Sequence, residues 1–189
     1  ICSVAENTMF ENCYLNSYAI GSGKYTGGLV GEALNCIVSA CRNEGSIIGA
    51  NAGGLFGYIK NATIKFCYNK ASISGDKSAG GLAINLNYCK VSDCYNSGDV
   101  NANEKDGAAG GFTCYVTALS KETYGSTIKY CYTAGDVIGY DAGKFCSNYS
   151  GDIFAMVRVY YEGKEVNDLS DADSDAGYKI IDQYEDYKK

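Results

Sequence analysis

The chain has 189 residues, with 24 glycines, 18 tyrosines and 10 cysteines but no proline, histidine or tryptophan, a composition typical of a β-rich chain with tight turns. Without histidine, the chain lacks the commonest general base, the commonest metal ligand and the His-dependent nucleophile pairs. A net charge of −6 with scattered Lys and Arg argues against nucleic-acid binding, and no apolar run approaches about 18 residues, so neither membrane insertion nor a secretory signal is expected.

An internal repeat extends along most of the chain and is aligned by one cysteine. The aligned cysteines are Cys13, Cys41, Cys67, Cys94 and Cys131. Apolar residues lie three before each of them (Phe10, Val38, Ile64, Val91, Ile128), six after (Ala19, Ile47, Ile73, Val100, Val137) and, in four coils, twelve before (Ile1, Leu29, Leu55, Leu82). In the fifth coil the last position is Phe112, 19 before its cysteine, so we place an insertion of about seven residues around 120–125.

This repeat predicts an all-β fold: a parallel β-helix of about six coils of ~27 residues, each with three short strands that stack on the next coil. A helical repeat is disfavoured because glycine pairs interrupt the apolar positions, which lack a helical period. We expect right-handed winding. The glycine pairs are expected at corners or close backbone approaches, and Asn43, Asn69 and Asn96 at left-handed corners where their side chains form a ladder.

The strings GGLVG at 27–31 and GGLFG at 53–57, weakening to GGLAI at 80–84 and GGFTC at 110–114, resemble the motif of GLUG repeats. The later segments TIKFCYNKASISG and VSDCYNSGDV are similar to the rest of that repeat, and the resemblance covers residues 1–161. It implies a surface-exposed or secreted bacterial protein, often adhesin-like, and a module also found in some immunoglobulin A peptidases. It carries over no catalytic residue, because a zinc peptidase of that kind needs an HExxH helix.

The cysteines are predicted to form a buried ladder of free thiols that act as small apolar side chains. Residues in one position of successive coils have parallel Cβ directions, which suit a disulfide poorly. Cys36 and Cys89 share a second position but are separated by the coil of Ala62, so they are too far apart to bridge. Without a CxxC pair or a histidine, neither a zinc site nor a catalytic thiol is expected.

Four tyrosines are the repeated candidates for a binding site: Tyr14, Tyr68, Tyr95 and Tyr132. Each follows a ladder cysteine, so strand alternation turns it outward if the cysteine points inward. Stacked on one face, these rings could form a platform for sugar rings or for a partner protein. The alternative is cross-strand packing that shields the sheet, which is favoured by the interruption of the row at Arg42.

The repeat fades after Gly151, although a sixth coil, in which Val159 replaces the cysteine, is still fitted by Phe154, Met156, Val159 and Tyr160. Residues 162–189 form an acidic C-terminal tail. Its residues Asp171, Asp173, Asp175 and Asp182 match positions 1, 3, 5 and 12 of a calcium loop, but position 6 is alanine instead of glycine and position 12 is aspartate instead of glutamate. A solvated acidic linker is the alternative to calcium binding.

The end of the tail predicts a short amphipathic helix that caps the last coil. Its apolar face consists of Ile180, Ile181, Tyr184 and Tyr187.

Three classes of function follow from these features. The first is a non-catalytic structural or adhesive module of a cell-surface or secreted bacterial protein, with a protein or glycan of a host or neighbouring cell as partner. The second is a carbohydrate-binding module that uses the tyrosines. The third is a β-helical polysaccharide-active enzyme, but the outward positions Glu11, Ser39, Lys65, Ser92 and Lys129 offer no paired acids. Because Ile1 already occupies the leucine position of a coil, we expect the chain to be part of a longer protein.

Overall fold

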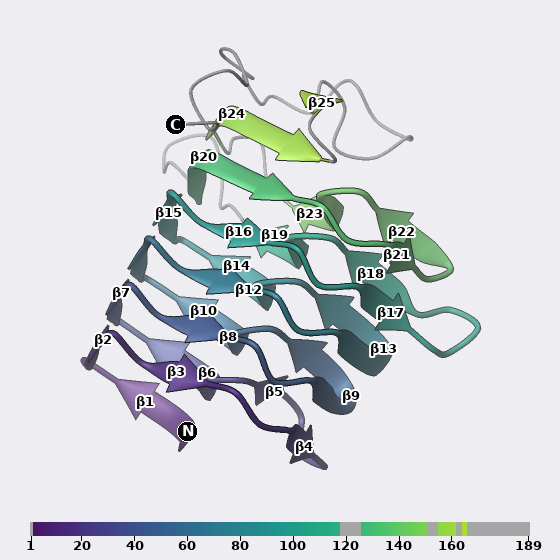
Figure 1. Cartoon of the computed structure of the whole chain (residues 1–189), viewed down its shortest axis with the longest axis horizontal. Helices are drawn as coiled ribbons and strands as arrows, with labels where there is room; N and C mark the ends of the chain where they lie inside the picture. The colour runs from purple at the N-terminus through teal and green to yellow at the C-terminus, as the bar shows by residue number, and fades with distance from the viewer. Residues whose placement is uncertain (1, 118–125, 151–154, 162–163, 166–189) are drawn as a thin grey trace.

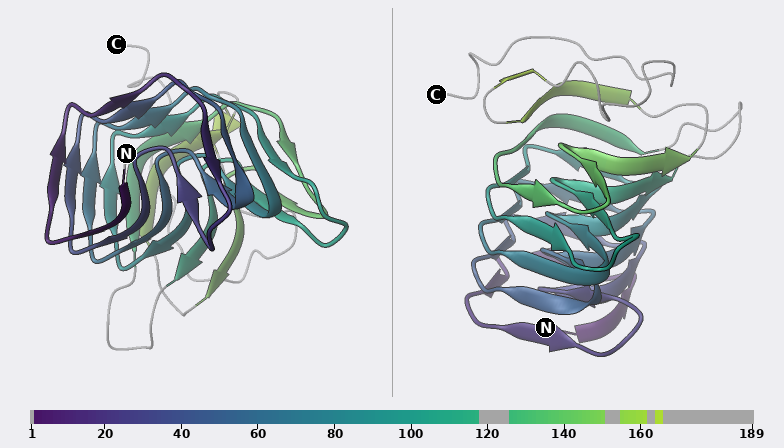
Figure 2. Two further views of the ribbon diagram at one scale, coloured as in Figure 1. Left: turned by 90° about the horizontal axis from the view of Figure 1, so that it is seen from below. Right: turned by 90° about the vertical axis from the view of Figure 1, so that its right-hand side faces the viewer.

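The computed structural model describes residues 2–117, 126–150, 155–161 and 164–165, and all regular structure in these segments is β-strand (Figure 1). The chain forms a parallel β-solenoid, as the repeat predicts. Val30 pairs in register with Cys2 in the coil before and with Phe56 in the coil after, and Phe56 pairs in turn with Ala83. Residues 2–117 make about four uninterrupted turns in this way, and the coil outline repeats along the axis (Figure 2).

Each side of the solenoid is a sheet that takes its strands from successive coils. The first sheet contains, in spatial order, β1 (Cys2–Glu6), β6 (Val30–Leu34), β10 (Phe56–Lys60), β14 (Ala83–Asn87), β19 (Thr113–Thr117) and β23 (Cys146–Ser150). The third sheet contains β4 (Ala19–Gly21), β5 (Thr26–Gly27), β9 (Ile47–Gly53), β13 (Ile73–Gly80), β17 (Val100–Ala102), β18 (Ala108–Gly110), β21 (Val137–Ile138) and β22 (Asp141–Gly143).

The second sheet has two arms that meet in the long strand β20. One arm contains β2 (Met9–Glu11), β7 (Ile37–Ser39), β11 (Thr63–Lys65), β15 (Lys90–Ser92) and β20 (Thr127–Thr133). The other contains β3 (Tyr14–Leu15), β8 (Arg42–Asn43), β12 (Tyr68–Asn69) and β16 (Tyr95–Asn96), with β24 (Ala155–Tyr161) following β20 and β25 (Lys164–Glu165) antiparallel to β24.

Side chains of one type form columns in the interior. The apolar position twelve before the cysteine is fully buried at Leu29, Leu55 and Leu82, and Phe112 occupies it in the fifth coil. Phe112 in turn stacks on Phe145, with ring centroids 4.6 Å apart. Burial of such a side chain contributes about 1.5–3 kcal/mol, and it is achieved only because the neighbouring coil covers it.

The left-handed corners lie in a different place from the one we expected. Asn43, Asn69 and Asn96 lie within strands. One set of positive φ values falls on the residue before each ladder cysteine, for example 55° at Phe66, and a second set falls on Asn7, Asn35, Asn61 and Tyr88. The reason is the direction of the side chains: Ile64 and Cys67 are both buried although three positions apart, so alternation must be reset between them. A left-handed residue makes that reset. The positive-φ residues before the ladder cysteines are Asn12, Ala40, Phe66, Asp93 and Tyr130.

The expected asparagine ladder is present. The amide Nδ2 of Asn43 donates to Oδ1 of Asn69 at 2.8 Å, and Nδ2 of Asn69 donates to Oδ1 of Asn96 at 2.7 Å. All three side chains are fully buried. The glycine pairs serve this ladder by close approach, because a Cβ added to Gly54 would lie 2.7 Å from Cγ of Asn69.

The sixth coil is described only in part. Strand β24 pairs with β20 so that Val159 lies opposite Cys131 and Met156 opposite Ile128, which is the register expected. The count of six coils is not confirmed, and the handedness stays a prediction. The expected insertion at 120–125, the capping helix and most of the acidic tail lie outside the described residues.

Candidate functional site: the tyrosine ladder and its surroundings

The candidate tyrosines lie in one column on the outer face of the second sheet. Tyr68 pairs in register with Tyr95, which pairs with Tyr132. Strand alternation positions them, because the preceding cysteine and the following residue, Asn69, Asn96 or Thr133, are both buried in the core. At one end, the backbone of Tyr132 pairs in register with that of Tyr160 in β24. At the other end the column runs through Arg42 to Tyr14.

Three of the rings stack on one another. The ring centroids of Tyr68 and Tyr95 are 4.8 Å apart with an interplanar angle of 8°, and those of Tyr95 and Tyr132 are also 4.8 Å apart, at 4°. Each ring face is therefore directed along the solenoid axis, toward the ring of the next coil. We call these three residues the tyrosine ladder. Its members are half-buried, and each presents its ring edge outward.

Arg42 continues the column instead of interrupting it. Its guanidinium carbon lies 4.4 Å from the ring centroid of Tyr14, within the range of a cation–π contact. A guanidinium can lie over an aromatic face, and in this coil Arg42 covers a face of Tyr14. The structure thus brings all four predicted tyrosines into one column: three stack directly, and Tyr14 lies two coils from Tyr68 in the same register, with Arg42 between them.

Glu44 joins the lower part of the column, and the sequence analysis missed it. Its carboxylate accepts a hydrogen bond from the Tyr14 hydroxyl at 2.8 Å and from the Tyr68 hydroxyl at 3.2 Å. The hydrogen bond from Tyr14 lowers the pKa of Glu44, and the same bond raises the pKa of Tyr14. Lys70 lies 4.0 Å from this carboxylate. The sequence does place Glu44 and Lys70 at equivalent positions of adjacent coils, each three residues after a ladder cysteine, and both are exposed in the structure. That shared position could have indicated that the two charges lie side by side.

This arrangement limits what the tyrosines can bind. Sugar rings bind to aromatic residues through an open ring face. In the ladder, both faces of Tyr95 and one face each of Tyr68 and Tyr132 are covered by a neighbouring ring. What the ladder presents outward is a row of phenolic edges at the strand spacing, in which the Tyr68 hydroxyl already donates to Glu44. The ladder therefore suits hydrogen bonding and packing along its edge more than face-to-face stacking with a sugar.

The cysteines are free thiols, as predicted. Eight of the ten are buried, Cys13 is half-buried and Cys2 is exposed. Burial raises the pKa of Cys89 to about 11 and that of Cys114 to about 12. Such thiols stay protonated at neutral pH, and a protonated, inaccessible thiol is a poor nucleophile and a poor metal ligand. The cysteine columns therefore act in packing.

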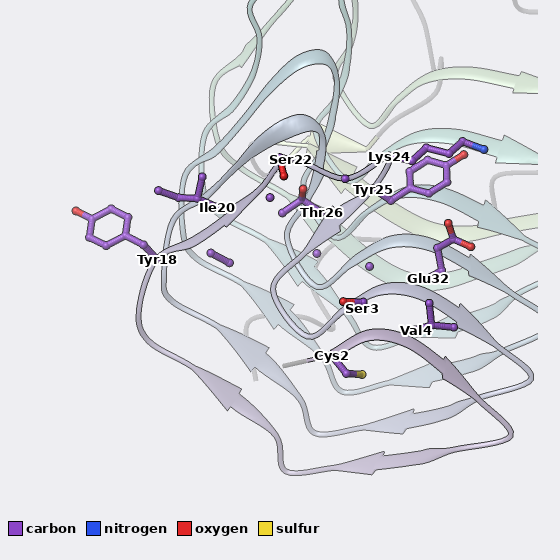
Figure 3. A pocket seen from close by; sticks show the side chains of 15 residues that line it. Cys2, Ser3, Val4, Tyr18, Ile20, Ser22, Lys24, Tyr25, Thr26 and Glu32 are labelled. Carbon is purple, nitrogen blue, oxygen red and sulfur yellow. The ribbon is translucent and has the colours of Figure 1, made fainter.

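A hollow of about 610 Å³ lies beside the first coil, between the segment 18–27 and strands β1 and β6 (Figure 3). Its charged side chains are Lys24 and Glu32, and Tyr18 and Tyr25 contribute aromatic surface. Lys24 lies 4.9 Å from the ring centroid of Tyr25. With one carboxylate, this hollow lacks the acid pair of a glycoside hydrolase.

The expected calcium ligands Asp171, Asp173, Asp175 and Asp182 lie outside the described residues, so that prediction is untested. Within the described segments, no three His, Cys, Asp or Glu side chains come together as a metal site would require. The same segments contain no helix of the length and apolarity needed to cross a bilayer.

Comparison with models of known protein families and with curated proteins finds no match for this chain. The resemblance to GLUG repeats thus depends on the motif and its register alone.

Proposed function

We propose that this chain is a non-catalytic structural and adhesive module of a larger bacterial protein, exposed at the cell surface or secreted. The observation that carries the proposal is the uniform stacking of the coils: the same inward columns of leucine, cysteine and asparagine recur from coil to coil and fill the interior. Such an interior makes a stiff rod whose outer faces repeat at the strand spacing. The resemblance to GLUG repeats supports the same role.

The partner in this proposal is a protein or glycan of a host or neighbouring cell. Repetition favours such a partner because several weak contacts along one face add up to firm attachment. A carbohydrate ligand is the narrower form of the proposal. For the tyrosine ladder, it would involve the hydroxyl edges in place of the ring faces.

The test is adhesion measured together with catalysis. Beads coated with the purified chain are incubated with candidate host and bacterial cells, and bound beads are counted with and without soluble chain as competitor. The same protein is incubated with a panel of polysaccharides and assayed for new reducing or unsaturated ends. Saturable, competed adhesion without product is expected. Product release would overturn the non-catalytic assignment, and adhesion no greater than that of albumin-coated beads would overturn the adhesive one.

A further inference from the structure

One arm of the second sheet presents a lattice of ammonium and hydroxyl groups that the tyrosine column does not use. We call it the lysine lattice; its residues are Thr63 and Lys65 of β11, Lys90 and Ser92 of β15, and Thr127 and Lys129 of β20. Between each pair lies a buried apolar residue: Ile64, Val91 or Ile128. Because strand side chains alternate, this burial fixes the six lattice side chains on the outer face.

Charged and hydroxyl groups alternate across the lattice in both directions. Lys65 pairs in register with Ser92, which pairs with Lys129, so the two lysines of this column are about 9.6 Å apart. The neighbouring column holds Thr63, Lys90 and Thr127 in the same order of coils. Each ammonium group therefore has a hydroxyl beside it on its own strand and another in the adjacent coil.

The three lysines are exposed and take no part in the ion pair found within the described segments, which joins Lys70 to Glu44. Their surroundings are basic although the whole chain is acidic. The second-sheet segments 9–17, 37–45, 63–71, 90–98 and 127–135 carry five Lys or Arg and three Asp or Glu, a net +2. The third-sheet segments 19–27, 47–53, 73–80, 99–110 and 136–144 carry four Lys or Arg and six Asp or Glu, a net −2.

We propose that the lysine lattice binds an anionic polysaccharide, such as a polymer of uronic acids, that runs along the solenoid axis. This inference rests on the proposed adhesive function and names the class of its ligand. The ammonium groups bind the carboxylates, and the serine and threonine hydroxyls bind the sugar hydroxyls between them. A glycan fits better than a nucleic acid because the lattice offers only three cations, on a chain whose net charge of −6 repels a densely charged polyanion.

The lattice is tested by binding of the full chain to immobilised polygalacturonate, with dextran as the neutral glycan and single-stranded poly(dT) as the nucleic acid. The key variant is K65Q/K90Q/K129Q. Its matched control, K24Q/K77Q/K105Q, removes the same charge from exposed positions along the third sheet. We expect the lattice variant to raise the Kd for polygalacturonate at least about tenfold at low salt and to flatten the salt dependence. The control should retain binding, as should K65R/K90R/K129R.

Several outcomes would overturn the lattice. These are an equal loss in both glutamine variants, equal affinity for dextran, or binding to poly(dT) in preference to polygalacturonate. Circular dichroism and urea melts of each variant exclude unfolding as the cause. The cell-adhesion assay separates this inference from the broader proposal. If the lattice variant adheres to cells as well as the wild type does, the lattice is wrong and the adhesive role stands. If the wild type itself does not adhere, the adhesive role fails.

Discussion

The ring of Tyr68 lies parallel to that of Tyr95, with centroids 4.8 Å apart, at the spacing of the strands that carry them. The sheet itself therefore sets the stacking distance, and the ladder stabilises the fold by holding adjacent coils together. Any ligand on this column meets ring edges.

The first prediction concerns the middle of the ladder. Tyr95→Ala removes two stacked pairs, and we expect the free energy of unfolding to fall by about 1–3 kcal/mol. Urea denaturation followed by circular dichroism measures the change. Tyr95→Phe should retain most of the stability, and Tyr140→Ala, at a highly exposed position, should change it by less than about 0.5 kcal/mol. Equal effects of Tyr95→Ala and Tyr140→Ala would show that the stack contributes nothing.

The asparagine ladder gives the second prediction. Asn69→Ala removes the acceptor of the buried Nδ2 of Asn43 and one of the two donors to Oδ1 of Asn96, so we expect a loss of about 2–4 kcal/mol. Asn69→Asp should also destabilise the fold, because its carboxylate cannot donate to Asn96. The matched control is Asn103→Ala, whose exposed amide donates to the Ser74 hydroxyl. Comparable urea midpoints for Asn69→Ala and the control would contradict the ladder's role.

The third prediction tests the leucine column. Leu55 is fully buried between Leu29 and Leu82, so Leu55→Ala should cost about 2–5 kcal/mol of stability. Ile37→Ala removes a side chain of the same size from a position that is 52% exposed, and it should cost less than about 1 kcal/mol. Urea melts of both variants measure the difference. A change at Leu55 within experimental error would place the register in doubt.

The fourth prediction concerns the access of reagents to the thiols. In the native protein, exposed Cys2 should react rapidly with a thiol reagent such as DTNB, half-buried Cys13 should react more slowly because burial raises its pKa, and the eight buried cysteines should react slowest. In denaturant without reductant, all ten should titrate. Cys2→Ser provides the control, because it should remove one rapid equivalent only. Recovery of only a few thiols in denaturant would mean that disulfides form.

The fifth prediction follows from the raised pKa values. The thiols of Cys89 and Cys114 keep their protons in the native state up to pKa values of about 11 and 12, whereas unfolded thiols ionise near pH 8.5. The unfolded state therefore binds fewer protons above pH 8.5, and stability should fall as pH rises. Each such thiol contributes a slope of about 1.4 kcal/mol per pH unit. Urea melts under reductant at pH 7, 8.5, 9.5 and 10 measure it.

The control for this pH dependence is Cys89→Ala, which lowers stability at all pH values through its cavity but should also reduce the slope. A variant whose slope equals that of the wild type would show that Cys89 does not titrate on unfolding. A fall in stability that begins below about pH 7, where unfolded thiols still hold their protons, would point to groups other than the thiols.

The register of the coils could be predicted from the sequence because a side chain that repeats at a fixed interval in a parallel stack must lie above its predecessor. That register is determined by the leucine column, Leu29, Leu55 and Leu82. Even where the repeat weakens, Val159 pairs with Cys131 as the register requires. The greater spacing between Phe112 and Cys131 does not disturb it, since β15 and β20 pair in register. The repeat thus fixed which residues share a column.

The direction in which each side chain points, and the contacts between side chains of different columns, depended on the tertiary structure. The repeat alone did not place the left-handed residue at Phe66 instead of Asn69, because that choice depends on which side chains the core can accept. Nor did it indicate that Arg42 stacks on Tyr14 or that Glu44 accepts two tyrosine hydroxyls. The lysine lattice appears only when Lys65, Lys90 and Lys129, 25 and 39 residues apart in sequence, come to lie on adjacent strands. Sequence periodicity determines stacking along the axis, whereas packing around each coil decides what the faces present.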